Sequence, residues 1–220
     1  MGRAKELVVK VIPSNIANSF IKKHHYSNKV VNNSNLHFGV FLDNKLHGVM
    51  SYGPSINKKG TINLVKTTKW NEFIELNRMA FDEILPRNSE SRAISQSIKL
   101  IKKNAPHIKW IISFADGCSC GDGTIYRASN FVLSGIAKNT ALRINPKTGE
   151  HTHIITAFHK KISDFKFWKP VEGYQFRYIY FIDKSYRNKL TVPEIPFSKI
   201  DELGIGMYKG KKISGDERND

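Results

Sequence analysis

Residues 108–115 read Ile-Lys-Trp-Ile-Ile-Ser-Phe-Ala, an almost continuous apolar run of strand length. A strand with apolar side chains on both faces is typical of a sheet that helices cover on both sides. A second, central strand is predicted over residues 73–81. Between the two strands, a helix capped by Asn88 or Ser89 is predicted from the helical spacing of four apolar residues: Ile94, Ile98, Ile101 and Ala105. The two strands and the helix between them, residues 73–115, form the centre of the predicted fold.

The flanking segments complete the element order. Upstream, we expect a strand over residues 7–12, a helix from Ser14 or Asn15 to about Tyr26, and a hairpin of residues 36–42 and 46–52. Downstream, the patterns predict a short helix over residues 125–130 and strands over 131–137, 142–144, 151–155 and 174–182. This order predicts an α/β (α+β) fold with a mixed, twisted sheet and helices on both faces. The predicted domain spans residues 1–192, and residues 193–220 are expected to form a basic, loosely packed tail.

The charge of the chain is its most informative bulk property. The 220 residues contain 35 Lys and Arg against 19 Asp and Glu, which gives a formal net charge of +16. Such a surface attracts polyanions, of which nucleic acid is the partner expected here, although a basic surface also serves solubility. No apolar run is long enough for a membrane span, and the N-terminus lacks a signal sequence. With two cysteines one residue apart, Cys118 and Cys120, a cytoplasmic protein is expected.

Two charged side chains stand out on the predicted strands. Arg78 interrupts an apolar strand, on which Ile74, Leu76, Arg78 and Ala80 are expected to share one face. It is either half of a structural ion pair or a functional cation. Asp116 follows the strand of residues 108–115, where ligands bind in open α/β sheets. It is either a general base or part of an ordinary Asp-Gly turn.

Two further segments suit ligand binding. In Gly123-Thr124-Ile125-Tyr126, the Tyr126 phenol lies in the first turn of a helix, as a proton donor or as a core aromatic. The loop before the helix at residues 88–92 offers main-chain amides to a phosphate, which capping alone would also explain. The residues assigned to cofactor binding are Asn88, Ser89, Ser91, Arg92 and Asn130.

Histidines and cysteines give only weak metal signals. His151 and His153 face the same way on a predicted strand, but Cys118-Ser119-Cys120 lacks the second pair of a zinc site. No metal ligands are therefore assigned, and a catalytic metal is left open.

Five segments, in their order and spacing, resemble the Mom family of Mu-like phages. They are residues 23–27, 52–56, 73–78, 110–117 and 123–131. The Ser-Phe-Ala-Asp-Gly block at 113–117 and the Gly-Thr-Ile-Tyr block at 123–126 are the most specific. The resemblance covers about residues 20 to 160.

The resemblance implies a GNAT-like transferase that modifies DNA. Such an enzyme places a two-carbon amide group, methylcarbamoyl or its glycyl isomer, on adenine N6, which protects phage DNA from host restriction. The family's important positions fall on His25, Tyr26, Arg78, Asp116 and Tyr126. We expect Asp116 to receive the N6 proton, Arg78 to hold a carboxylate or phosphate, and Tyr126 or Tyr26 to protonate the leaving group or stack on a flipped adenine.

The identity of the acyl donor and two alternative functions stay open. Residues 86–92 lack the Gly-rich pyrophosphate loop of typical GNAT enzymes, so acetyl-CoA and an aminoacyl-tRNA such as glycyl-tRNA are both considered. One alternative is a GNAT-like enzyme that acts on RNA or a small amine. The other is a non-catalytic nucleic-acid-binding protein that uses an aromatic strand composed of Tyr174, Phe176, Tyr178 and Tyr180. The oligomeric state is left open.

Overall fold

The computed structural model describes residues 3–118, 121–203, 207–208 and 211–212. These residues form two compact units. The first unit comprises Met1–Phe114, Thr124–Gly135 and Arg177–Pro196, and the second comprises Ala115–Gly123, Ile136–Phe176 and Phe197–Asp220.

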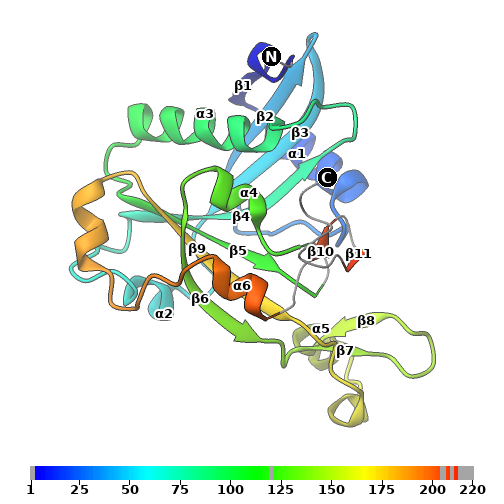
Figure 1. Cartoon of the computed structure of the whole chain (residues 1–220). Helices are drawn as coiled ribbons and strands as arrows, with labels where there is room; N and C mark the ends of the chain where they lie inside the picture. Colours follow the sequence, from blue (N-terminus) through cyan, green and yellow to red (C-terminus); the bar gives the residue numbers. More distant parts are fainter. Residues whose placement is uncertain (1–2, 119–120, 204–206, 209–210, 213–220) are drawn as a thin grey trace. The chain divides into compact units, whose positions relative to one another are not determined.

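A seven-stranded mixed sheet runs in the order β1-β2-β3-β4-β5-β9-β6 (Figure 1). Its strands are β1 (Val8–Val11), β2 (Leu36–Leu42), β3 (Lys45–Gly53), β4 (Phe73–Phe81), β5 (Trp110–Asp116), β6 (Val132–Lys138) and β9 (Tyr174–Phe181). The first four strands pair antiparallel, whereas β4 and β5 pair parallel from Phe73↔Trp110 to Leu76↔Ser113. The crossover between β4 and β5 contains helix α3 (Ser89–Asn104), as the sequence predicts.

The β2–β3 hairpin has the predicted turn. Asp43 and Asn44 both have positive φ, 50° and 61°, in the left-handed region that Asn and Asp tolerate best after glycine. Two central residues with positive φ form the turn whose twist matches that of the flanking strands. The predicted hairpin is therefore confirmed.

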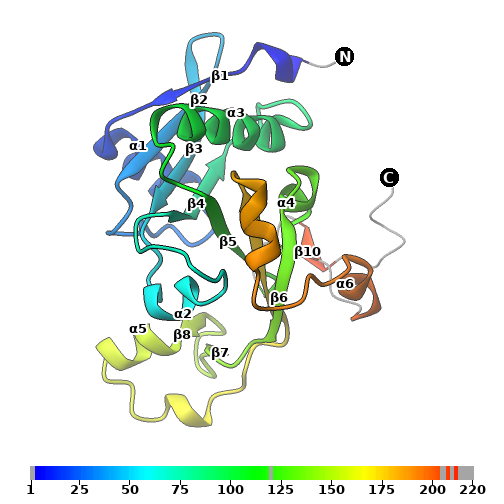
Figure 2. The same ribbon diagram turned by 90° about the vertical axis from the view of Figure 1, so that its left-hand side faces the viewer.

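Helices cover both faces of the sheet in the first unit (Figure 2). Helix α1 (Ser14–His24) buries Ala17 and Ile21 against Val49 and Ala80. On the other face, the Tyr52 hydroxyl on β3 lies 2.7 Å from Ser97 Oγ of α3. Val49 and Tyr52 are three residues apart on one strand, so they point to opposite faces. The predicted fold class is confirmed.

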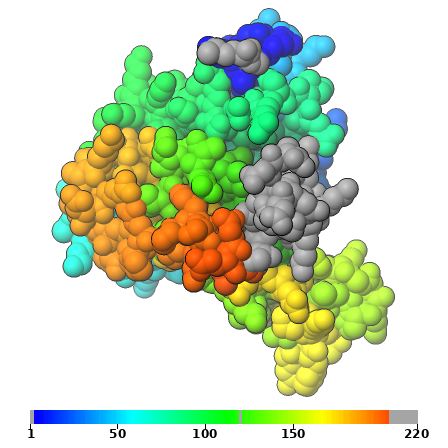
Figure 3. Space-filling view, in the orientation of Figure 1, coloured from blue at the N-terminus to red at the C-terminus, as the bar shows by residue number. Residues whose placement is uncertain are grey.

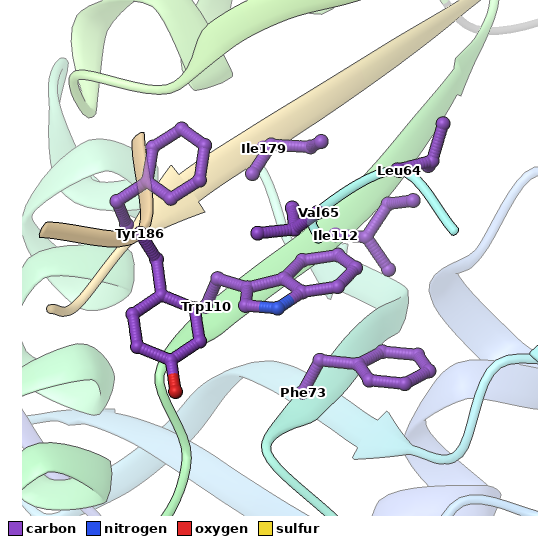
Figure 4. Packing of buried hydrophobic residues seen from close by; sticks show 8 residues of the cluster. Leu64, Val65, Phe73, Trp110, Ile112, Ile179 and Tyr186 are labelled. Atoms are coloured by element: carbon purple, nitrogen blue, oxygen red, sulfur yellow. The ribbon is translucent and has the colours of Figure 1, made fainter. Parts of the chain in front are cut away.

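A buried cluster fills the first unit around Trp110 (Figure 4). The Trp110 and Phe73 rings stack with their centroids 4.6 Å apart, and Ile112 and Ile179 pack in the same cluster. Val65 is also buried here, from a segment after the short helix α2 (Lys58–Ile62) that no sequence pattern predicts. This cluster fixes β4 and β5, the strands that carry Arg78 and Asp116.

One bulge changes which residues share a face of β4. Ser51 of β3 pairs with Arg78, but the next residue, Tyr52, pairs with Leu76, so Asn77 has no partner in this ladder. Paired residues on neighbouring strands point to the same face. Arg78 and Ala80 therefore face α1, whereas Leu76 faces α3. The prediction that Leu76 shares a face with Arg78 is wrong, because the extra residue reverses the alternation.

The second unit contains an antiparallel hairpin of β7 (Leu142–Ile144) and β8 (His151–His153), which is confirmed around its predicted turn. The predicted strand over residues 151–155 is wrong at its end, because helix α5 (Ile154–His159) begins at Ile154. The His153 side chain accepts a hydrogen bond from the Ile155 amide and caps this helix.

The rest of the described chain is short elements. The first unit adds α4 (Thr124–Ala128) and the 3-10 helices Arg3–Glu6 and Lys184–Lys189. The second adds a 3-10 helix at Phe165–Phe167, α6 (Ser198–Glu202) and the paired strands β10 (Met207–Tyr208) and β11 (Lys211–Lys212). The predicted tail lies partly outside the described residues. Within it, Ile200 is buried.

Candidate functional site

Arg78 is at the centre of a polar group on the α1 face of β4. Its Nε donates to the Lys29 carbonyl oxygen at 3.1 Å, and its Nη1 donates to the Asn77 carbonyl oxygen at 2.7 Å. The bulge also brings Glu75 to this face, since Glu75 pairs with Gly53 and Arg78 with Ser51. Burial raises the pKa of Glu75, and the positive charge of Arg78 partly offsets this effect. Main-chain carbonyls thus orient the Arg78 guanidinium beside a buried carboxyl group.

His25 follows the last residue of α1 and is neutral. Burial, and then the nearby charge of Arg78, lowers its pKa from 6.5 to about 4. Its Nδ1 accepts a hydrogen bond from the Ser27 amide at 3.1 Å, so the ring proton of the neutral form lies on Nε2. The His25 ring contacts the Tyr26 ring at 4.3 Å, and Tyr26 is 53% exposed. The structure therefore brings His25, Tyr26 and Arg78 together.

Asn77, the bulged residue, has an unsatisfied side-chain donor. The side chain is buried, and its Oδ1 accepts from Ser34 Oγ at 2.7 Å. Its Nδ2 is buried without a hydrogen-bond partner among the described residues. An unpaired buried donor costs stability, so it is a candidate for binding a ligand oxygen. The sequence patterns do not place Asn77 in the site. Its one signal in the sequence is a second polar side chain beside Arg78 in an apolar strand.

Tyr126 lies in the core of the first unit, where it contacts Tyr178 at 5.0 Å between ring centroids. Its hydroxyl is 2.7 Å from Ser113 Oγ, which is also 2.8 Å from the Leu76 carbonyl oxygen. Ser113 Oγ is the donor to both oxygens, so the Tyr126 hydroxyl accepts from Ser113 in this contact. Tyr126 is therefore a buried core aromatic, and its role as a proton donor stays a prediction.

A cavity of about 440 Å³ lies at the N-terminus of α3. Four of the five residues assigned to cofactor binding line it: Asn88, Ser91, Arg92 and Asn130. The fifth, Ser89, is fully buried and donates to the Pro86 carbonyl oxygen at 2.5 Å. Lys5 and Arg87 add positive charge to the lining.

The α3 N-terminus itself has features of an anion site. The Asn88 side chain makes no capping hydrogen bond, and Asn88 adopts a left-handed conformation with φ of 69°. Arg92 Nη2 donates to the Lys5 carbonyl oxygen at 3.1 Å, whereas its buried Nε has no partner among the described residues. A helix N-terminus with basic side chains around it favours an anionic group.

Asp116 belongs to the second unit. Its Oδ1 accepts a hydrogen bond from the Cys118 amide at 3.0 Å, the geometry of a turn after a strand. Gly117 is required there, since a Cβ atom would lie 2.6 Å from the Tyr174 carbonyl oxygen. The turn therefore fixes the direction of the Asp116 carboxylate at the end of β5.

Three sequence signals lead to no site in the described residues. No group of three His, Cys, Asp or Glu side chains within them could hold a metal ion, and Ser119 and Cys120 lie outside them. In the aromatic strand of the alternative binding hypothesis, Phe176 and Tyr178 are buried, so they cannot stack on bases. Over the same part of the chain, no helix is both long and apolar enough to cross a membrane.

Comparisons with known proteins agree with the resemblance in the sequence. The model of the Mom protein family matches residues 6–199. The protein of Escherichia phage Mu named methylcarbamoylase mom is 37% identical over 197 residues, which cover 86% of this chain and 80% of that protein.

Solved structures give the fold. The spermidine/spermine N-acetyltransferase SpeG from Vibrio cholerae, in complex with manganese ions, matches 85% of this chain and 99% of its own, with a TM-score of 0.50 and 10% identity. A GNAT family acetyltransferase from Elizabethkingia anophelis with acetyl-CoA bound has a TM-score of 0.46 at 10% identity, over 80% of this chain and 98% of its own. The likeness to SpeG confirms the predicted GNAT-like fold.

Proposed function

Because this chain belongs to the Mom protein family, we propose that it transfers a methylcarbamoyl group, or the isomeric glycyl group, to N6 of adenine in DNA. The observation that carries this proposal is its 37% identity, over 86% of its length, to a protein named methylcarbamoylase. A net charge of +16 suits a polyanionic substrate. We further propose that the modification protects phage DNA from host restriction.

The proposed chemistry for the glycyl form is an acyl transfer. Adenine N6 attacks the carbonyl carbon of an activated donor, a new N–C bond forms, and the bond from that carbon to the leaving sulfur or oxygen breaks. Asp116, at the end of β5, is the proposed acceptor of the N6 proton. Tyr126 is the proposed proton donor to the leaving group, supported by its place in the Gly-Thr-Ile-Tyr block that resembles the Mom family.

The polar group on β4 is proposed to bind the reacting carbonyl and the base. The free Asn77 Nδ2 donates to the carbonyl oxygen, on which negative charge develops during attack. Arg78 holds a carboxylate or phosphate next to it. Tyr26, half exposed and in contact with His25, stacks on the flipped adenine.

The cavity at the α3 N-terminus is the proposed place for the phosphates of the donor. Its lining by Lys5, Arg87 and Arg92 suits the diphosphate of a CoA thioester or the 3′-terminal nucleotide of an aminoacyl-tRNA. A glycyl ester already contains both carbons and the nitrogen of the added group, whereas an acetyl group lacks that nitrogen. We therefore propose glycyl-tRNA as the donor, with acetyl-CoA as the alternative.

Purified protein tests this proposal directly. Duplex DNA is incubated with the protein and either glycyl-tRNA or acetyl-CoA, each isotope-labelled in the acyl group, then digested to nucleosides. Label in an adenine nucleoside that depends on the protein supports the proposal and identifies the donor. Label in RNA nucleosides or in a small amine, with none in DNA, would contradict it in favour of the corresponding GNAT-like alternative.

A further inference from the structure

The second unit has several large apolar side chains that are exposed to solvent. Ile154, Ile155 and Phe158 of α5 are 50%, 57% and 79% exposed, and Phe167 is 78% exposed. On the helix, Ile154 and Ile155 lie four and three residues before Phe158, so the three side chains share a face. We call residues 136–176 the basic arm; they are yellow-green to yellow in Figure 3. Exposed apolar side chains that share one face, as on α5, are typical of a binding surface.

A small buried cluster of the basic arm lies next to Phe158 and Phe167 in the chain. Ala157, Phe165 and Trp168, neighbours of these two residues in the chain, are buried together in a cluster. Arg143 donates to the carbonyl oxygens of Lys166 and Trp168 at 2.9 and 2.8 Å. Because their neighbours are fixed, the two exposed rings are presented without a large loss of conformational entropy on binding.

The charge of the arm identifies the kind of partner. It contains seven Lys and Arg against three Asp and Glu. Lys160, Lys161, Lys166 and Lys169 are exposed, whereas Asp164 Oδ2 accepts a hydrogen bond from Trp168 Nε1. Lys166 Nζ lies 4.8 Å from the centre of the Phe167 ring, so a cation and an exposed ring occur side by side. Alternating cations and rings fit a polyanion with stacked aromatic bases.

We propose that the basic arm binds duplex DNA, with its lysines on the phosphates and the Phe158 and Phe167 rings inserted where the base stack opens. This inference rests on the proposed function, because an adenine that leaves the duplex for reaction leaves a gap in the stack. Apolar side chains that enter a base step unstack and bend the duplex. In this proposal the lysines of the basic arm contact the DNA phosphates, and its two rings stabilise the base step that the adenine has left.

A duplex with one abasic site tests the insertion, because its stack is already open. We compare the affinity of the full chain for this duplex and for the intact duplex by fluorescence anisotropy, over a range of salt concentrations. The wild type should prefer the abasic duplex by about tenfold, since part of the unstacking cost is removed. Phe158→Ala/Phe167→Ala should lose this preference. Both rings are exposed, so its thermal unfolding should match that of the wild type.

A lysine pair tests the phosphate contacts separately. Lys160→Gln/Lys161→Gln should keep the abasic preference but reduce the slope of log affinity against log salt by about 1.8, at about 0.9 for each phosphate contact. Two matched controls come from the first unit: Lys102→Gln/Lys103→Gln, an adjacent exposed pair on α3, and Ile84→Ala, an exposed apolar side chain. Both should behave as the wild type.

Several results would overturn the inference. One is a wild type that does not prefer the abasic duplex over the intact one. Another is a double phenylalanine variant that keeps this preference. A third is an equal slope of log affinity against log salt for the two lysine-pair variants. Loss of binding to phosphatidylserine vesicles in the phenylalanine variant, with DNA binding intact, would assign the surface to a membrane instead. The assay involves no acyl transfer. A protein that binds in this way but modifies no DNA would therefore refute the proposed function and leave the arm's role standing.

Discussion

At the scale of single residues, His25 couples stability to pH. Its pKa is 6.5 in an unfolded chain and about 4 in the fold, so between these values the unfolded chain binds a proton that the folded chain excludes. The contribution of His25 to the free energy of unfolding is fully present above pH 6.5. As the pH falls toward 4, about 3 kcal/mol of it is lost. Urea unfolding at about pH 7 and about pH 4 should show a smaller loss for His25→Gln than for the wild type. An exposed control, His159→Gln, should lose as much as the wild type, and equal losses in all three proteins would contradict the account.

Asn77 tests the polar group on β4. Asn77→Asp replaces the unpaired Nδ2 donor with an oxygen and retains an acceptor for Ser34. If Asn77 Nδ2 donates a hydrogen bond to the reacting carbonyl, this variant should transfer the acyl group more slowly, on the order of a hundredfold, at a saturating concentration of the acyl donor. Ser34→Ala removes the other partner of the same side chain and should lower the rate far less. Full activity of Asn77→Asp would exclude the proposed role.

Sequence patterns identify the charged residues of the site but not their neighbours. Arg78 stands out because a cation in an apolar strand is costly without a partner. That Glu75 rather than Leu76 lies on its face depends on one bulged residue, and nothing local to residues 73–81 marks the bulge. The low pKa of His25 arises in the same way from long-range packing, which brings the end of α1 to β4.

At the scale of elements, the N-terminus of α3 tests the donor. Arg92→Glu reverses a charge that lines the cavity, so calorimetry should show acetyl-CoA affinity reduced at least about tenfold if its diphosphate binds there. Lys102→Glu, on the exposed last turn of the same helix, is the matched control and should bind as the wild type does. DNA affinity should change little in both variants.

The outcomes of this calorimetry are distinct. No heat from the wild type with millimolar acetyl-CoA would favour an aminoacyl-tRNA donor. Equal affinity of the wild type and Arg92→Glu would place the cofactor elsewhere on the chain.

Elements with a strong period are predictable from the sequence, and short ones are not. The long helix α3 has a clear helical spacing of apolar residues, and the strands from β1 to β5 are apolar runs of strand length bounded by turn residues. Helix α5 has two β-branched isoleucines, which favour a strand, but the His153 cap begins a helix before them. Helix α2 has five residues, too few for a periodic signal.

At the scale of the whole molecule, the net charge of +16 and the exposed aromatic residues of the basic arm together support a protein that acts on DNA. The charge predicts the class of partner from composition alone. Where the contacts lie depends on which aromatics are buried: Phe165 and Trp168 form a core, whereas Phe167 between them is exposed. Sequence spacing alone does not separate these three rings.

Mass spectrometry of nucleosides from the DNA of cells that express this chain tests the central claim most directly. We predict a new adenine nucleoside that carries one methylcarbamoyl or glycyl group in place of one hydrogen, absent from cells without the protein. Asp116→Asn, which removes the proposed proton acceptor, should abolish it. Product undiminished by Asp116→Asn would exclude only the role of Asp116. A nucleoside profile that wild-type protein leaves unchanged would contradict the claim that this chain modifies DNA.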